Sequence, residues 1–175
     1  MSIGGCSMEF VLRKLEMADA ESIAKYANNI NIAKNVRNIF PHPYTLEDAR
    51  AFIDDCRQSE ELCQYIRAIV VNQQAVGVIG CTRQTDVHCK CSEIGYWLGE
   101  EFWGRGIVTN AVVQISREVF QCQDVARIFA EIFAFNTGSI KVLEKAGFQL
   151  EGKLKSSIYK NGVIYDSYIY GLIQH

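Results

Sequence analysis

Apolar residues recur with the 3.6-residue period of a buried helix face in three segments of the chain. The apolar positions are Ala20, Ile23, Ala24 and Ala27; Leu46, Ala49, Phe52, Ile53 and Cys56; and Val108, Ala111, Val112, Ile115, Val119 and Cys122. Asp19 precedes the first segment and Thr45 precedes the second, so we expect each to be an N-cap. Asp48 lies three positions after Thr45, which predicts a capping box.

A fourth, shorter helix is expected from Gly138 to Ala146. Gly147 suits the left-handed position just beyond a helix, and Phe148 can pack back on Leu143 as in a Schellman motif. The segment from Asn28 to Tyr44 has no clear period and contains two prolines, so we expect a long connection there.

Seven segments have the composition or alternation of β-strands. They are Phe10–Leu15, Leu62–Val71, Ala75–Thr82, Lys90–Leu98, Arg127–Phe135, Gln149–Leu154 and Val163–Ile173. The triplet Asn72-Gln73-Gln74 and the pair Asn161-Gly162 predict hairpin turns. The expected order is β-α-α-β-β-β-α-β-α-β-β, an α+β fold with a mixed, mostly antiparallel sheet flanked by helices. We expect one domain over residues 8–175, and we exclude residues 1–7 as a disordered or non-native extension.

Composition excludes several classes of protein. The chain has 175 residues, of which 49% are hydrophobic and 22% charged, and its formal net charge is −2. This profile is typical of a globular domain, and without a Lys/Arg-rich run it argues against nucleic-acid binding. No apolar stretch is long enough to span a membrane, and no secretory signal opens the chain. We therefore expect a cytoplasmic protein that acts on neither membranes nor nucleic acids.

The seven cysteines, at positions 6, 56, 63, 81, 89, 91 and 122, are odd in number and scattered, which favours reduced thiols. The run from His88 to Cys91 resembles half of a metal site. It offers only two thiolates, and no second pair lies at zinc-site spacing, so we expect no metal.

The triplet Gly104-Arg105-Gly106 lies between an expected strand and an expected helix. A helix N-terminus carries unpaired N–H groups and partial positive charge, so such a turn can hold a phosphate. A dinucleotide fingerprint needs a third glycine where Thr109 stands, and a Walker A loop needs Gly-Lys-Ser/Thr. The turn thus indicates a phosphate ligand of another kind.

Two stretches around this turn resemble the GNAT superfamily of N-acetyltransferases, and within it the RimJ/RimL type, which includes ribosomal-protein N-terminal acetyltransferases. They are EIGYWLGEEFWGRGIVTNAV (Glu93–Val112) and FNTGSIKVLEKAGF (Phe135–Phe148). The stretches Leu12–Ile23 and Ile39–Ile53 look similar to the same type. The resemblance implies the GNAT fold and acetyl-CoA as co-substrate.

By this resemblance, the pyrophosphate of acetyl-CoA is expected on the turn and the helix start, and its pantetheine arm beside the preceding strand. The implied binding residues are Tyr96, Trp97, Leu98, Gly104, Arg105, Gly106, Ile107, Val108, Thr109, Asn136 and Ser139. Val108 is larger than the residue usual at its place, but its N–H is unchanged.

Glu93 is the candidate general base, because strand alternation places it on one face with Gly95 and Trp97. It is equally readable as a surface carboxylate or an ion-pair partner. Ser139 is the candidate acid, since Asn136-Thr137-Gly138-Ser139 matches the Asn-x-x-Ser of RimL-type relatives. Ser139 can instead serve only the backbone of a helix start, and Asn136 can be its N-cap.

Two side chains common in relatives are missing. Leu143 stands where many carry a tyrosine, and Ile158 stands where RimL-type enzymes carry a glutamate. Three readings follow: an N-acetyltransferase working by direct attack in a ternary complex, a non-catalytic acyl-CoA sensor, or a structural phosphate-binding domain. For the first, the acceptor is a peptide N-terminus or a small-molecule amine, and a homodimer is expected by resemblance.

Overall fold

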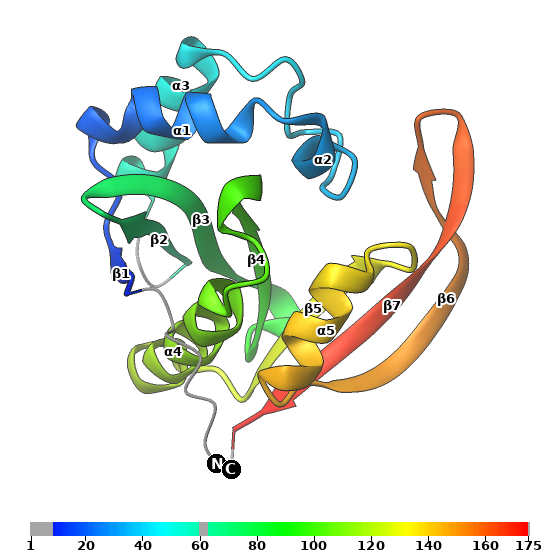
Figure 1. The fold of residues 1–175 in the computed structure, drawn as a ribbon. Coiled ribbons are helices and arrows are strands. Elements are labelled where there is room, and N and C mark those ends of the chain that lie inside the picture. The colour runs from blue at the N-terminus through cyan, green and yellow to red at the C-terminus, as the bar shows by residue number, and fades with distance from the viewer. Residues whose placement is uncertain (1–8, 60–62, 175) are drawn as a thin grey trace, which may run out of the picture.

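The computed structural model describes residues 9–59 and 63–174, so the expectations for residues 1–7 lie outside the described part. Seven strands form one sheet in the order β1-β2-β3-β4-β5-β7-β6 (Figure 1). Their bounds are β1 Val11–Arg13, β2 Gln64–Val71, β3 Gln74–Arg83, β4 Cys91–Leu98, β5 Arg127–Phe133, β6 Gln149–Lys160 and β7 Val163–Ile173. The β4–β5 pair is parallel and the other pairs are antiparallel, as the expected mixed sheet requires.

The described residues form five α-helices, of which α1 and α3 are grouped over the first strands of the sheet and α4 and α5 lie apart from them (Figure 1). Their bounds are α1 Ala20–Ala27, α2 Ile30–Ala33, α3 Leu46–Gln58, α4 Ile107–Cys122 and α5 Thr137–Lys145. One buried cluster joins α1 and α3 to β2 and β3, and a larger one joins α4 and α5 to β3, β4 and β5. Strands β2 and β3, which contribute to both clusters, are therefore buried on both faces.

Most of the local signals act as expected. Thr45 and Asp48 form the capping box of α3. Asn161 and Gly162 both have positive φ in the β6–β7 turn. Gly147 has φ +93°, and the Phe148 N–H donates to the Leu143 carbonyl at 3.0 Å, which completes the Schellman motif.

Three expectations are wrong. The Asp19 carboxylate does not cap α1, because it accepts two bonds from Arg13 and one from the Glu16 N–H. The connection Asn28–Tyr44 contains the short helix α2, whose N-cap Asn29 accepts from the Asn31 N–H. Strand β6 continues past Leu154 to Lys160, twice the expected length, through a register shift at which Ser156 has positive φ.

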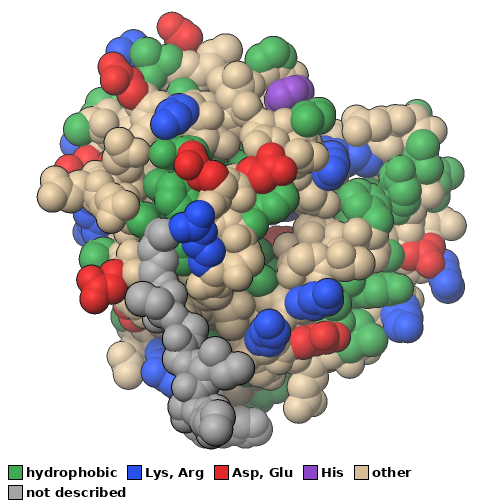
Figure 2. Space-filling model, viewed as in Figure 1, with side chains coloured by type: hydrophobic (Ala, Val, Ile, Leu, Met, Phe, Trp, Pro, Cys, Tyr) green, Lys and Arg blue, Asp and Glu red, His purple; other side chains and the backbone are tan. Residues whose placement is uncertain are grey.

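The sheet opens between β4 and β5. These strands pair only from Cys91 to Glu93, and beyond that point β5 continues its pairing with β7. The rest of β4 therefore turns one edge toward a gap rather than toward a neighbouring strand. Figure 2 shows the surface hollowed near the middle of this face of the molecule.

Candidate active site

The open edge of β4 presents backbone groups to the gap. The Gly99 N–H donates to the Val76 carbonyl at 2.8 Å, so this residue bonds to β3. Alternate residues of an antiparallel ladder bond to the same neighbour. It follows that Trp97 and Gly95 bond to β3, whereas the N–H and C=O of Leu98 and Tyr96 point toward β5. The direction of the Leu98 amide, which the sequence could not give, is toward the gap.

The Gly-Arg-Gly turn adjoins this edge and leads directly into α4. Gly104 and Gly106 have φ of +73° and +76°, a backbone conformation that other residues adopt at a cost. Gly106 is the N-cap of α4, so the first N–H groups of that helix, from Ile107 to Thr109, point out of its N-terminus. These groups and the helix dipole suit a pyrophosphate.

Trp103 fixes the turn to the strand. Its indole Nε1 donates to the Leu98 carbonyl at 2.7 Å, while 42% of the residue remains exposed. Val108, which is larger than the residue usual at its place, packs partly against the core around α4 and partly lines the cleft.

Helix α5 faces the open edge of β4 from the other side of the gap. The Asn136 side chain caps it, with Oδ1 accepting from the Ser139 N–H and Nδ2 donating to Ser139 Oγ, each at 3.1 Å. The Tyr96 hydroxyl donates to the Ser139 carbonyl at 3.4 Å. Because Ser139 Oγ accepts from Asn136, its own proton is left to donate into the cleft. Asn136 is therefore both the expected N-cap and a contact of Ser139.

A cavity of about 890 Å³ brings these groups together. Of the residues predicted to bind or act, it is lined by Glu93, Tyr96, Trp97, Leu98, Gly104, Gly106, Ile107, Val108, Thr109, Asn136 and Ser139. Arg105 lies in the turn but outside this lining. The volume, the open strand edge and the helix N-terminus fit a long ligand with a phosphate at one end and a linear arm.

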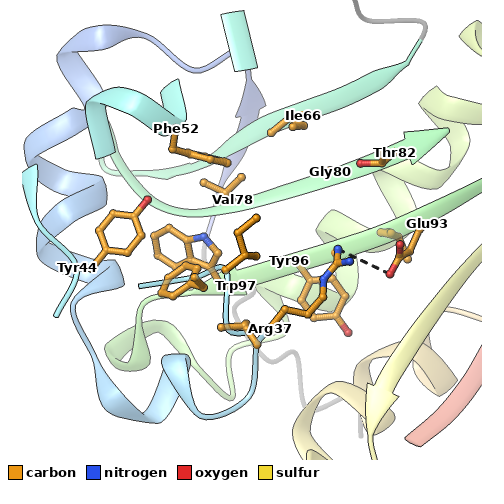
Figure 3. A pocket seen from close by; sticks show the side chains of 15 residues that line it. Arg37, Tyr44, Phe52, Ile66, Val78, Gly80, Thr82, Glu93, Tyr96 and Trp97 are labelled. Carbon is orange, nitrogen blue, oxygen red and sulfur yellow. Dashed lines mark ion pairs between the residues drawn. The ribbon is translucent and has the colours of Figure 1, made fainter. Parts of the chain in front are cut away.

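Glu93 lies where this cavity meets a second hollow of about 260 Å³ (Figure 3). Its side chain is 28% exposed, and Oε1 is 3.9 Å from Nη2 of Arg37, a residue of the loop after α2. The ion-pair reading of Glu93 is thus correct, and the pair lies at the cavity junction. Val36 and Arg37, together with β4 from Glu93 to Trp97, line both spaces.

Sequence reasoning missed Lys160, at the end of β6. It is only 6% exposed, lines the large cavity, and donates from Nζ to the Val36 carbonyl at 2.6 Å and to Asn38 at 3.1 Å. Burial lowers the pKa of this amine. Lys160 links the β6–β7 hairpin to the loop after α2 across the cleft. In the sequence, Lys160 is marked only by its position before the Asn161-Gly162 turn, and that position does not indicate a contact with a distant loop.

Three findings concern only the described part of the chain. All six cysteines there are free thiols. In residues 9–59 and 63–174 no group of three or more His, Cys, Asp or Glu side chains is placed to hold a metal ion. Over the same ranges, no helix combines the length and apolarity needed to cross a bilayer.

The model of the acetyltransferase (GNAT) domain family matches residues 9–149. The chain belongs to this family. It is 28% identical over 165 residues to the N-acetyltransferase p20 of Bacillus licheniformis, covering 93% of this chain and 92% of that protein. It is 31% identical over 105 residues to the ribosomal-protein-serine acetyltransferase of Escherichia coli, covering 60% and 58% of the two chains.

The solved structures agree on the fold. The microcin C7 self-immunity acetyltransferase MccE, in complex with acetyl-CoA and AMP, superposes with a TM-score of 0.83 at 28% identity, covering 95% of this chain and 93% of its own. The ribosomal L7/L12 acetyltransferase RimL, in complex with CoA, gives a TM-score of 0.84 at 21% identity, covering 95% of each chain. These structures confirm the GNAT fold, and the sequence match to the ribosomal-protein-serine acetyltransferase confirms the RimJ/RimL likeness. Membership of this family also confirms the prediction of an acetyl-CoA-dependent acetyltransferase.

Proposed function

We propose that this chain transfers the acetyl group of acetyl-CoA to the primary amine of a peptide N-terminus or a small molecule, by direct attack in a ternary complex. The observation that carries the proposal is the junction at Glu93. There the open edge of β4, beside the α4 N-terminus, meets a separate hollow. A thioester lying along β4 and an amine in that hollow come together at this point, without a covalent enzyme intermediate.

Each residue has a role in this proposal. The N–H groups of Ile107, Val108 and Thr109 hold the pyrophosphate, and the β4 edge at Tyr96 and Leu98 holds the arm. The Leu98 N–H stabilises negative charge on the thioester oxygen. Glu93 takes a proton from the attacking amine, directly or through water, and Ser139 gives one to the leaving thiolate.

The test is release of free CoA thiol from acetyl-CoA by the purified protein with a broad panel of amines and peptides. We expect turnover with at least one acceptor, and kcat/KM should rise with pH until the α-amine, with a pKa near ~8, is neutral. Thiol release no greater than background with every acceptor would falsify the proposal.

Glu93→Gln should lower kcat about 100-fold, the usual contribution of a general base, while KM for acetyl-CoA stays within about twofold. Glu47→Gln, which neutralises an exposed carboxylate at the start of α3, is the matched control and should leave both constants unchanged. An unchanged kcat in Glu93→Gln would leave the ion pair with Arg37 as the whole role of Glu93.

A non-catalytic acyl-CoA sensor is the second candidate. It is favoured by Leu143, which is fully buried in the core at the place of a common tyrosine, and by Ile158 at the place of a glutamate. Calorimetry showing tight CoA binding without turnover would favour it. We also predict, from the resemblance alone, a homodimer and a cytoplasmic location; light scattering and cell fractionation test these.

A further inference from the structure

The hollow beside Glu93 has a graded lining that follows from the register of β3 and β4. Three cross-strand pairs face it in succession: Val78 with Trp97, Gly80 with Gly95, and Thr82 with Glu93. One end of its floor is therefore apolar, the middle consists of backbone without side chains, and the other end is polar. Figure 3 shows Tyr44 and Trp97 at the first end and Glu93, paired with Arg37, at the other.

The middle of the floor is hollow because both residues of the central pair are glycines. A Cβ built on Gly95 meets no atom within 4 Å. A Cβ on Gly80 would lie 2.8 Å from Cγ1 of Ile66, so that side chain leans over the floor from β2. The space above Gly95 is thus real room for a ligand group, bounded on one side by Ile66.

The walls are aromatic and uncharged. Phe40, from the loop before α3, packs edge-on against Trp97 with 6.0 Å between ring centroids and lies tilted against Tyr44 at 4.9 Å. Phe52 of α3 lines the same hollow. Burial, with a smaller effect from Asp48, raises the pKa of Tyr44 to about 12, so its hydroxyl stays neutral. Apolar groups are stabilised here, and charged groups find no partner.

Charge in this hollow is confined to one end. Of its described lining residues, only Arg37 and Glu93 carry charge, and they face each other at 3.9 Å. Gly95 is two residues from Glu93, roughly 6.6 Å along an extended strand. When the amine of an acceptor lies beside Glu93, the group attached next to that amine therefore lies above Gly95 and against the aromatic wall.

We propose that the acceptor carries its primary amine next to one compact apolar group, aromatic or branched aliphatic, which occupies the space above Gly95. The inference rests on the proposed acetyl transfer and narrows its acceptor. Peptides that begin with Phe or Leu, or the corresponding simple amines, meet this description. Polyamines and aminoglycosides do not, because each further ammonium lacks a carboxylate in the hollow.

The experiment measures CoA release with tetrapeptides that differ only at their first residue, Phe, Leu, Ser or Ala, and with spermidine. We expect kcat/KM for the Phe or Leu peptide to exceed that for the Ser peptide and for spermidine by about 10-fold or more. Turnover in which Ser or spermidine equals or exceeds both apolar acceptors overturns this inference and leaves acetyl transfer standing. No turnover with any acceptor overturns the proposed function itself.

Gly95→Val tests the location of the selective group. Its backbone lies outside the left-handed region, so the added side chain fills the hollow without strain. We expect kcat/KM to fall about 10-fold for the Phe and Leu peptides and to change less than about twofold for the Ala peptide. Gly152→Val, in β6, is the matched control, because its added Cβ also has no atom within 4 Å. It should leave kcat/KM unchanged for all of these peptides.

If Gly95→Val lowered kcat/KM equally for all acceptors, the apolar group of the acceptor would not lie above Gly95. Should Gly95→Val fold poorly, Gly95→Ala provides the same comparison with a smaller insertion, and the wild-type ranking of acceptors decides independently.

Discussion

At the scale of single residues, the site depends on how each side chain is oriented by a neighbour. Asn136 bonds both the N–H and the hydroxyl of Ser139, so one residue caps α5 and leaves the Ser139 proton available to donate. Arg37 Nη2 lies 3.9 Å from Glu93 Oε1 at the junction of two cavities. Alternation and resemblance make Glu93 and Ser139 candidates, and both line the large cavity. The sequence could not give Arg37 as a partner, because a loop contact 56 positions away has no local signal.

Ser139→Ala should lower kcat by about 10-fold or more, since the thiolate would then leave without a positioned proton donor. KM for acetyl-CoA should change less than about twofold, because the backbone cradle at the turn is untouched. Steady-state kinetics on the best acceptor provide the measurement.

Ser139→Cys is the conservative partner of this variant, because a thiol keeps a donatable proton. It should recover part of the lost kcat. Equal kcat in wild type and Ser139→Ala would instead assign Ser139 only to the start of α5.

At the scale of elements, the order of helices and strands could be predicted because its signals are local. Gly147 ends α5 and Asn161-Gly162 turns β6 into β7, and both act through their own φ values. The length of β6 could not be predicted, since a register shift around Ser156 breaks the alternation of apolar and polar residues and most of the strand is exposed. Asp19 was misread because its partner Arg13 competes for it from another element. Burial alone would raise the pKa of Asp19, but the Arg13 and Glu16 bonds lower it overall.

The turn into α4 is the element whose function is most open to test. Gly106→Ala forces a Cβ into a left-handed conformation at φ +76°, which costs about 1 kcal/mol but produces no clash, since no atom lies within 4 Å. The turn should relax away from that conformation, and KM for acetyl-CoA should rise about five- to tenfold.

Gly162→Ala supplies the matched control. It has φ +81°, equally open surroundings, and a place at the far end of the β6–β7 hairpin. It should lose similar stability with no change in KM for acetyl-CoA. A similar KM in the two variants would remove the phosphate role of the turn.

At the scale of the whole molecule, the site is the consequence of a sheet that opens. Strands β4 and β5 pair over three residues and then separate, β4 remaining paired with β3 and β5 with β7 of the long β6–β7 hairpin (Figure 1). Lys160 bridges the two sides at the far end of the gap. Periodicity predicts each strand but not the point at which two of them separate, so this gap could not be predicted from the sequence.

A ligand that binds along the gap should stabilise the entire fold, because it contacts both sides of the opening. At 100 times its Kd, CoA should add about 2.7 kcal/mol to the free energy of unfolding. For a domain of this size that is a rise in Tm of about 5–10 °C. ADP has the pyrophosphate but not the arm, so at the same concentration it should raise Tm by less than half as much. Differential scanning fluorimetry measures both. Equal shifts would mean that the open edge of β4 contributes nothing to binding, whereas no shift with either ligand would remove CoA from the site altogether.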